Sequence, residues 1–341
     1  MKKMKIALLG FGNVGRALAQ LLIAKREVLR EQYQIEWSIV GIATRRHGSV
    51  LKSSGIDLEA ALSLATADKE ISTLAPNNSD IDGVTFVRMS GADVLFENTP
   101  VNYQTGQPAI DHITTALELG MHAITANKGP VVHAFDRLAE LAQAKGARFL
   151  YESTVMDGAP IFSLWQEVLP VAKLHSFRGV LNSTTNLILT LMEMEKSFDE
   201  ALAHTQAIGI AETDPSGDIM GWDSAVKVAA LVTVLMGIPL PPDIIKREGI
   251  EHISLEDVIK AREEGRRWKL ICQAWRDGKG VKASVGPEQI DPNDSLYNVM
   301  GTSSAVTFVS DVLGDLTITE TNPGPHTTAY GLLADFIRAV R

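Results

Sequence analysis

Cysteine is nearly absent from this chain of 341 residues, which has a single thiol at Cys272. One cysteine excludes an internal disulfide framework and a zinc site built from several thiolates, so the chain fits the reducing cytoplasm. The simplest interpretation of Cys272 is a thiol packed in a core. Long apolar runs are missing as well. Gly10 and Gly12 interrupt the apolar start of the chain, so we expect neither a signal peptide nor a membrane-spanning helix.

Positive charge is also scarce. The chain has 32 Lys and Arg residues against 41 Asp and Glu residues, which gives a formal net charge of −9. Binding of duplex nucleic acid needs clustered basic side chains that neutralise phosphates. We therefore expect no nucleic-acid or membrane partner, and a small molecule as the ligand. A hydrophobic content of 45% allows a core large enough for two domains.

The N-terminus carries a pattern typical of a nucleotide-binding turn. The apolar run KIALLG is followed by GFGNVG and then by residues 16–32, which have the apolar spacing of a helix. In such a turn Gly10 permits the bend, Gly12 lets a pyrophosphate approach the backbone, and Gly15 lets helix and strand pack closely. The helix N-terminus adds amide donors and a positive dipole end. The pattern predicts dinucleotide binding, with a purely structural turn as the alternative.

The second predicted strand, residues 36–44, is not followed by a carboxylate. An NAD-selective site usually has an acidic residue there to hold the ribose hydroxyls, whereas an arginine can hold a 2′-phosphate. Arg45 and Arg46 follow the strand, which favours NADP and leaves NAD possible. Two solvated arginines without a ligand are the alternative. Residues 47–83 are predicted to be a polar excursion with one short helix at 57–65.

The alternation of strand and helix then resumes. Strands at 92–100 and 122–131 flank a helix at 107–120, and a helix at 132–146 leads to a last strand. These segments predict a Rossmann-type parallel sheet domain over residues 1–150. Ligands of such sheets bind beyond the carboxyl ends of the strands. Four polar residues that follow the strands should therefore face the cofactor: Asn98, Thr99, Asn127 and Lys128.

Residues 151–315 have a different character. They alternate strands and helices without glycine-rich phosphate turns, which indicates an α+β domain that binds the substrate. Residues 316–341 end in an apolar helix at 328–340, which we expect to return to the nucleotide-binding domain. The predicted fold class is thus α/β, with a Rossmann-type domain followed by an α+β domain.

The segment AETDPSGDIMGWDSAVK leads into a helix at 222–237 that is apolar nearly all round. A lysine in such a helix must be paired or face a wet cleft, because an unpaired buried charge is too costly. Asp223 lies four residues before Lys227, so the two share a helical face, and Asp223 would orient Lys227 and keep it protonated. An exposed, weak pair is the alternative.

Three further carboxylates precede this helix, namely Glu212, Asp214 and Asp218. Their oxygens could accept hydrogen bonds from an ammonium group. Together with Lys128 and Lys227, they suit a zwitterionic amino acid that carries one reactive carbonyl or alcohol.

Four motifs, GFGNVG, TANKGP, GVLNSTTN and GIAETDPSGDIMGWDSAVK, resemble those of the homoserine dehydrogenases in order and spacing. The resemblance runs from the first strand to the final helix. It implies reversible hydride transfer between NAD(P)H and L-aspartate 4-semialdehyde to give L-homoserine, a step in threonine and methionine biosynthesis. It also implies a homodimer, with dimerisation through the second domain.

The resemblance implies a role for individual residues. Lys227 would donate the proton, with Asp223 beside it and Lys128 assisting at the same oxygen or positioning the substrate. The implied substrate contacts are Glu212, Asp218, Asp223, Ser183 and Thr184. The implied cofactor contacts are Gly10, Gly12, Asn13, Val14, Gly15, Arg45, Arg46, Thr99, Lys128, Gly209, Glu212 and Gly324.

The loop ESTVMDGA resembles one that holds a monovalent cation, typically sodium, mostly through backbone carbonyls. The implied ligands are Glu152, Val155, Asp157 and Ala159. Oxygen ligands suit a hard cation, and an ordinary turn is the alternative.

The chain departs from the family pattern in two respects. Ser183 stands where the family commonly has glycine, so a substrate contact through that backbone is less secure. No aspartate kinase half or ACT domain is visible in the sequence, so we expect no threonine feedback through such a domain. A dehydrogenase for another small amino acid and a non-catalytic NADP-binding sensor remain alternative functions, although a sensor would need Lys227 or Asp223 to be missing.

Overall fold

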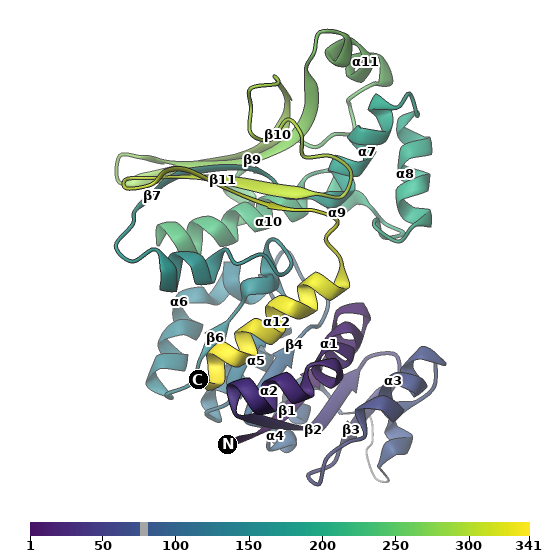
Figure 1. The fold of residues 1–341 in the computed structure, drawn as a ribbon, viewed down its shortest axis with the longest axis vertical. Coiled ribbons are helices and arrows are strands. Elements are labelled where there is room, and N and C mark those ends of the chain that lie inside the picture. Colours follow the sequence, from purple (N-terminus) through teal and green to yellow (C-terminus); the bar gives the residue numbers. More distant parts are fainter. Residues whose placement is uncertain (76–80) are drawn as a thin grey trace. The chain divides into compact units, whose positions relative to one another are not determined.

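A computed structural model describes residues 1–75 and 81–341, which form two compact units (Figure 1). Unit 1 comprises Met1–Pro160 together with Gly324–Arg341, and unit 2 comprises Ile161–Pro323. Part of the excursion predicted at 47–83, namely residues 76–80, lies outside the described residues. In the described part of the chain, no helix combines the length and apolar character that crossing a membrane requires.

A mixed sheet of six strands forms the centre of unit 1. Its order is β3-β2-β1-β4-β5-β6, the order of doubly wound nucleotide-binding folds, and all pairs are parallel except β2 with β3. The strands are β1 (Lys2–Leu9), β2 (Ile35–Thr44), β3 (Gly48–Leu51), β4 (Val94–Glu97), β5 (His122–Thr125) and β6 (Phe149–Leu150). Their near-continuous apolar sequences fit a sheet that is covered on both faces. The predicted Rossmann-type fold class is confirmed.

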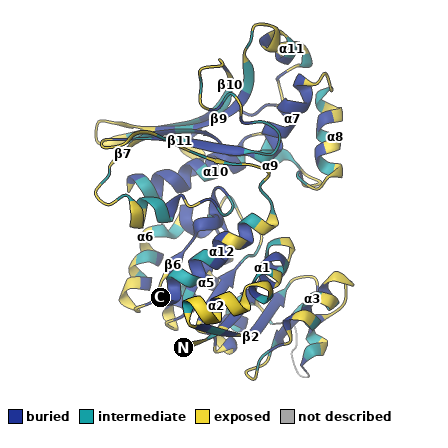
Figure 2. Cartoon of the chain, viewed as in Figure 1, coloured by how far each residue is buried: buried dark blue, intermediate teal, exposed yellow. Residues whose placement is uncertain are grey.

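Seven α-helices are described in unit 1, and two short 3₁₀ helices accompany them. The α-helices are α1 (Asn13–Ala24), α2 (Arg26–Tyr33), α3 (Leu58–Thr66), α4 (Gly83–Ser90), α5 (Ala109–Glu118), α6 (Lys128–Ala144) and α12 (Pro325–Val340). The 3₁₀ helices are η1 (Ile71–Leu74) and η2 (Glu152–Thr154). Figure 2 shows that α2 is largely exposed, whereas the second half of β1 and all of β4 are buried.

Three predictions for unit 1 need correction. The helix predicted at 16–32 is interrupted at Lys25, whose ψ of 8° ends α1 before α2 begins. The helix predicted at 132–146 begins at Lys128, because the Asn127 side chain caps it by accepting the Gly129 N–H. The excursion predicted at 47–83 also contains β3 and η1, and its last residue, Gly83, begins α4. Strand β3 depends on pairing with β2, a tertiary contact.

Helix α12 completes the core of unit 1. Its apolar face, which includes Leu332 and Phe336, belongs to the same buried cluster as Phe96 of β4 and Leu18 of α1. The rings of Phe96 and Phe336 lie 6.0 Å apart, within the range of favourable aromatic pairs. The end of the chain is therefore part of the nucleotide-binding unit, as its apolar helical pattern suggested.

Unit 2 is built on a second sheet of six strands, in the order β12-β11-β7-β9-β10-β8. All neighbours are antiparallel except β10 and β8. The strands are β7 (Leu174–Val180), β8 (Lys246–Arg247), β9 (Arg267–Asp277), β10 (Gly280–Ile290), β11 (Ser304–Ser310) and β12 (Gly314–Glu320). Cys272 lies in β9 and is fully buried, as expected, and burial raises the pKa of its thiol to about 11.

Helices pack on this sheet and carry the acidic motif. They are α7 (Ser183–Glu193), α8 (Phe198–Ala207), α9 (Ser216–Ile219), α10 (Trp222–Leu231) and α11 (Leu255–Glu263). Short turns complete the unit: η3 (Leu164–Val168), η4 (Val232–Met236) and η5 (Pro242–Ile244). The helix predicted at 222–237 is confirmed, because α10 continues into the π-helical η4 and ends at Gly237, whose φ is +66°.

Candidate active site

The glycine turn of unit 1 joins β1 to α1. Gly10 has a φ of +98°, and a Cβ there would lie 2.4 Å from the Asn98 carbonyl oxygen. A Cβ on Gly15 would lie 2.3 Å from the Gly10 carbonyl oxygen, so both positions need glycine for steric reasons. Gly12 differs, because a Cβ there would meet no heavy atom within 4 Å. The open space beside Gly12 fits a group that approaches the backbone at the start of α1.

Two predicted cofactor residues occupy the first turn of α1. Asn13 is the first residue of the helix and is exposed, and its side-chain oxygen accepts a 2.9 Å hydrogen bond from Arg16. Val14 is half-buried and packs against the core of unit 1. No carboxylate lies in this first turn, so nothing in it opposes the positive end of the helix dipole.

Asn98 lies beside Gly10, directly after β4. Its backbone N–H donates to the Leu9 carbonyl at 2.7 Å, which fixes the β4 end next to the β1 end. Its side-chain Oδ1 and Nδ2 are buried, and they form no hydrogen bond within the described part of the chain. A buried amide without a partner costs about 1–3 kcal/mol. This amide therefore fits a polar group of a nucleotide bound at the strand ends.

Arg45 and Arg46 form the turn between β2 and β3, where Thr44 pairs with Gly48. Both side chains are exposed, and neither guanidinium forms an ion pair or hydrogen bond with another described residue. The turn thus presents two positive charges that no described carboxylate neutralises. This arrangement is compatible with the phosphate recognition predicted from the sequence.

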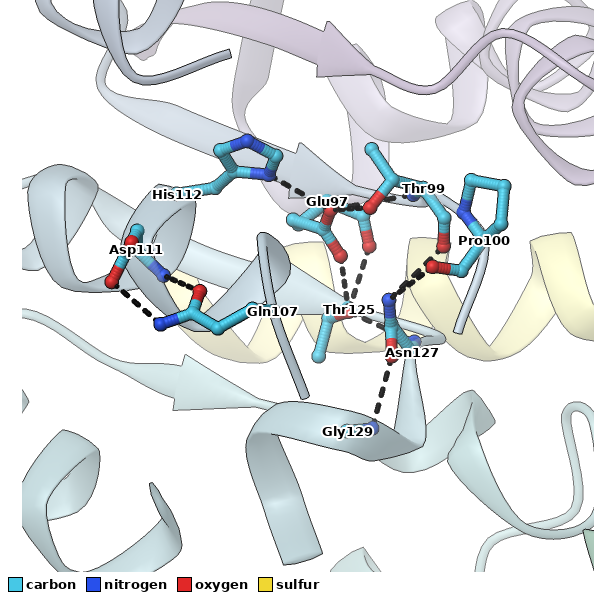
Figure 3. A network of polar contacts seen from close by, with 9 residues as sticks. All are labelled: Glu97, Thr99, Pro100, Gln107, Asp111, His112, Thr125, Asn127 and Gly129. Atoms are coloured by element: carbon cyan, nitrogen blue, oxygen red, sulfur yellow. Dashed lines mark hydrogen bonds and ion pairs between the residues drawn. The ribbon is translucent and has the colours of Figure 1, made fainter. Parts of the chain in front are cut away.

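Thr99 and Lys128 belong to turns that a polar network joins (Figure 3). Asn127 donates from Nδ2 to the Thr99 carbonyl at 3.0 Å and caps α6 by accepting the Gly129 N–H at 2.9 Å. Lys128 is the first residue of α6 and is half-buried. The structure therefore brings together the β4 and β5 turns, as their positions at the carboxyl ends of adjacent parallel strands predict.

The predicted cation loop, residues 152–159, is fastened to α12. The Glu152 N–H donates to Asp335 Oδ2 at 2.8 Å, and Thr328 donates from Oγ1 to Asp157 Oδ1 at 2.5 Å. The Glu152 carboxylate is buried and lies 3.5 Å from the Arg338 guanidinium. Burial raises the pKa of the Asp335 carboxyl to about 7.

Side-chain carboxylates are therefore engaged around this loop. Val155 and Ala159 are buried in it, and Asp157 has a φ of +41°, which turns the chain. Among the described residues, no cluster of three or more His, Cys, Asp or Glu side chains could hold a metal ion. A cation here would depend on backbone carbonyl oxygens. Gly324, a predicted cofactor residue, lies in unit 1 as the N-cap of α12.

In unit 2, Lys227 lies on α10 with its ammonium group held by two oxygens. Nζ donates to the Leu181 carbonyl at 2.6 Å and lies 3.1 Å from Asp223 Oδ2. The Lys227 side chain is 15% exposed and that of Asp223 is 10% exposed. The pairing predicted from their spacing is confirmed, and the exposed, weak pair is excluded.

Asn182 is a polar residue of this cluster that the sequence analysis missed. Its Nδ2 donates to Asp218 Oδ1 at 2.6 Å and to Asp223 Oδ2 at 3.1 Å, while its Oδ1 accepts the Thr185 N–H that begins α7. The only sequence signal was its position as a helix N-cap in LNSTTN. Burial, and then the negative charge of Asp223, raise the pKa of Asp218.

The remaining predicted residues of unit 2 lie in different surroundings. Thr184 is buried, and its hydroxyl donates to the Ile210 carbonyl at 3.5 Å and lowers the pKa of Asp218, whereas Ser183 is half-buried as the first residue of α7. Glu212 is exposed in the loop after α8, and its carbonyl accepts a hydrogen bond from Gln206. Gly209 follows α8 with a φ of +76°, a conformation that favours glycine after a helix. The structure thus groups Thr184 with the carboxylate cluster and leaves the Glu212 side chain in the exposed loop.

The two units provide different chemistry. Unit 1 has a glycine turn, open backbone amides and an unpartnered amide at the switch between β1 and β4, where dinucleotides bind in such sheets. Unit 2 has a half-buried ammonium group beside carboxylates. A unit suited to a dinucleotide and a unit with a proton donor define the class of NAD(P)-dependent oxidoreductases.

Comparison with known proteins narrows the class. Residues 10–152 match the family model of the homoserine dehydrogenase NAD-binding domain, and residues 160–337 match that of homoserine dehydrogenase. The chain belongs to the homoserine dehydrogenase family. It is 35% identical to the NAD(+)-dependent homoserine dehydrogenase of Pseudomonas canavaninivorans over 99% of this chain and 96% of that protein. It is also 35% identical to homoserine dehydrogenase of Methanocaldococcus jannaschii over 98% of each.

Solved structures agree with this assignment. A hyperthermophilic archaeal homoserine dehydrogenase in complex with NADPH matches with a TM-score of 0.85 and 28% identity, covering 99% of this chain and 98% of that chain. A homoserine dehydrogenase from Thiobacillus denitrificans matches with a TM-score of 0.84 and 29% identity, covering 100% of this chain and 74% of that one. The enzyme class and the family resemblance drawn from the motifs are confirmed.

Two glycine substitutions should separate folding from cofactor binding. Gly10→Ala places a methyl group against the Asn98 backbone at a left-handed φ, so we expect a loss of about 2 kcal/mol or more in unfolding free energy. Gly12→Ala meets no protein atom, so its stability should change by less than about 0.5 kcal/mol, while NADPH affinity falls. Urea unfolding and NADPH fluorescence titration measure the two effects. Native cofactor affinity in Gly12→Ala would contradict the open-space argument.

The raised pKa of Asp218 gives a prediction about pH. Because the folded protein holds this proton more tightly, the carboxyl contributes stability below the reference pKa of 3.8, and that contribution is lost as pH rises through the raised pKa. Asp218→Asn removes the titration and keeps an acceptor for Asn182. We expect the variant to be more stable than wild type by about 0.5–2 kcal/mol at pH 7, with the difference shrinking toward pH 4. Thermal unfolding of both proteins from pH 7 to pH 4 measures this difference in stability. A difference that did not depend on pH would contradict the prediction.

Proposed function

We propose that this chain reduces L-aspartate 4-semialdehyde to L-homoserine, reversibly and with NAD(P)H, and that Lys227 is the proton donor. The observation that carries the proposal is the position of the Lys227 ammonium group, between Asp223 Oδ2 at 3.1 Å and the Leu181 carbonyl at 2.6 Å. Both acceptors favour the charged form of the lysine. The two acceptors also fix the direction from which Lys227 can donate a proton.

The reaction requires a donor of this kind. The bound nicotinamide supplies the hydride. As negative charge develops on the carbonyl oxygen of the substrate, an ammonium group already in place can stabilise it and transfer a proton. Asp223 and Leu181 prepare Lys227 for that role without rearrangement, because both contacts exist in the described structure.

The carboxylate cluster of unit 2 suits the amino end of the substrate. Asp218 and Asp223 share the Nδ2 group of Asn182, and Thr184 contacts Asp218. A substrate ammonium group beside Asp218 would counter the burial and the negative charge of Asp223, which together raise the pKa of this carboxyl. We assign substrate binding to this cluster, with Glu212 and Ser183 as further contacts.

The cofactor proposal concerns unit 1. The glycine turn and the first residues of α1 would hold the pyrophosphate, and Thr99 and Lys128 would contact the cofactor near the ends of β4 and β5. Two unneutralised guanidinium groups after β2 support NADP as the preferred form. The resemblance also assigns cofactor contacts to Gly209, Glu212 and Gly324.

Two further proposals concern assembly and location. The β7, β9 and β11 strands of unit 2 carry half-exposed side chains, including Arg178, Gln273 and Thr307, on the sheet face that the unit's helices leave open. We propose that a second copy of the chain covers this face to form a homodimer, which a measured monomer mass would exclude. The single cysteine supports a cytoplasmic location.

The proposed function predicts the effect of Lys227→Met. This substitution keeps most of the apolar volume and removes the proton and the charge, so kcat should fall by about 10²–10⁴-fold while NADPH affinity barely changes. Asp223 loses its partner, so folding must be verified by circular dichroism. Exposed Lys282, which pairs with Asp277, offers a matched Lys282→Met control. A folded Lys227→Met enzyme with near-native turnover would refute the mechanism.

The same assays test the substrate. Wild-type protein is expected to oxidise L-homoserine in preference to other small amino-acid alcohols, with either nicotinamide cofactor supplied. Absence of turnover on homoserine, together with intact cofactor binding, would favour one of the alternative functions.

The NADP preference predicts the effect of Arg45→Glu. A carboxylate at this turn repels the 2′-phosphate and can accept ribose hydroxyls, so KM for NADP should rise far more than KM for NAD. Steady-state kinetics with both cofactors at saturating homoserine measure the ratio. Equal effects on the two cofactors would show that Arg45 does not select between them.

The cation proposal predicts a dependence on sodium. We propose that the carbonyls of Glu152, Val155, Asp157 and Ala159 bind a monovalent cation, because the side-chain carboxylates of the loop are already paired with α12. Exchange into tetramethylammonium chloride should lower the melting temperature and the turnover, and sodium chloride at equal ionic strength should restore both. Unchanged stability and activity after complete exchange would count against the site.

A further inference from the structure

Glu97, the last residue of β4, is a buried carboxylate that the proposed reaction does not use. Its side chain is 0% exposed, although it ends in a charged group. A carboxylate in such surroundings is tolerated only where hydrogen-bond donors compensate for the lost water. Figure 3 shows the donors around it, which come from three different elements of unit 1.

The first donors belong to the turn that follows β4. The Thr99 N–H donates to Glu97 Oε1 at 3.3 Å, and the Thr99 hydroxyl donates to the same oxygen. Both hydrogen-bond donors of Thr99 are therefore held by one carboxylate oxygen. His112 of α5 contacts the same oxygen, with its Nδ1 3.3 Å from Glu97 Oε1.

The second oxygen faces the end of β5. The Thr125 hydroxyl lies 3.3 Å from Glu97 Oε2 and donates to the Glu97 carbonyl at 2.7 Å. The same hydroxyl accepts the Asn127 N–H at 2.9 Å, and Asn127 returns to the Thr99 carbonyl through Nδ2 at 3.0 Å. These bonds form a closed ring through Glu97, Thr99, Asn127 and Thr125.

The ring has a geometric consequence. It joins the turn that carries Thr99 to the N-cap of α6, which carries Lys128 as its first residue. Neighbouring parallel strands fix the spacing of their backbones, but their turns lie beyond the last ladder bond at Glu97 and Thr125. The side-chain ring supplies bonds between these two turns, and Asn127 adds one to the Pro100 carbonyl at 3.4 Å.

We propose that Glu97 is a positioning residue, whose buried carboxylate sets the relative placement of Thr99 and Lys128 for cofactor binding and hydride transfer. The inference rests on the proposed cofactor roles of these two residues. This role explains why a charged residue, Glu97, ends the otherwise apolar strand β4. A misplacement of about 1 Å in such a site can reduce the rate by about 10²-fold.

Three single variants, one double variant and one control test the proposal. Glu97→Ala removes every contact of the carboxylate, whereas Glu97→Gln keeps an acceptor for Thr99 and offers an amide to Thr125. Thr125→Val breaks the ring at its opposite side. Ser90→Ala is the control, because Ser90 is also a buried hydroxyl of unit 1, bonded only to the Val87 carbonyl and the Ala92 N–H among described residues.

The readouts are NADPH affinity by fluorescence titration, kcat and KM with homoserine, and melting temperature. In folded Glu97→Ala we expect the NADPH Kd to rise and kcat to fall by about tenfold or more each, with Glu97→Gln within about threefold of wild type. The double variant Glu97→Ala with Thr125→Val should be no worse than Glu97→Ala alone, because both changes break one ring. Ser90→Ala should lower only the melting temperature.

Two results would overturn the proposal. One is a folded Glu97→Ala enzyme with native Kd and kcat, which would leave Glu97 a purely structural role. The other is a double variant whose losses in NADPH affinity and kcat are fully additive, which would show that Glu97 and Thr125 act separately. If wild-type protein failed to turn over homoserine, the proposed function would be wrong, whereas the NADPH titrations would still decide the role of Glu97.

Discussion

The half-buried charge of Lys227 on α10 is the constraint on which unit 2 depends. Lys227 cannot lie in an apolar helix without compensation, so Asp223 and the Leu181 carbonyl must lie where they do. Asp223 then requires a donor of its own, which Asn182 provides, and Asn182 in turn fixes Asp218 and the start of α7. The Lys227 ammonium group thereby constrains the end of β7, the starts of α7 and α10, and the carboxylates of Asp218 and Asp223. The same arrangement leaves the Asp218 carboxyl buried and next to the negative charge of Asp223, both of which raise its pKa and both of which a cationic group would counter.

Unit 1 uses the opposite principle at its site. Where unit 2 fills space with paired charges, the glycine turn keeps space open. Gly10 and Gly15 bring backbones so close that no side chain fits, and Gly12 leaves open space at the start of α1. Positive charge is supplied by the exposed turn at Arg45 and by the N-terminus of α1. The two units therefore suit a large anionic cofactor and a small zwitterion, respectively.

Much of this organisation could be predicted from the sequence because it has local causes. The glycine spacing, the apolar strands of unit 1 and the i, i+4 spacing of Asp223 and Lys227 each depend on residues close together in the chain. Features that depend on distant partners were missed. The short β3 exists only through pairing with β2, and the carboxylate contacts of Asn182 depend on residues 36 and 41 positions away. The break at Lys25 also escaped prediction, because the apolar pattern of a helix continues across it.

The return of α12 to unit 1 has a consequence for synthesis on the ribosome. Domains usually fold in the order in which they emerge, and unit 2 is a continuous segment that is complete once Pro323 has been made. Unit 1 begins first but finishes last, because Phe336 and its neighbours belong to its core. Until α12 has been made and has emerged, the nascent nucleotide-binding unit exposes the apolar surface that this helix later covers. A ribosome that stalls within α12 would therefore hold a finished second unit and an unfinished first one, a state open to chaperones and proteases.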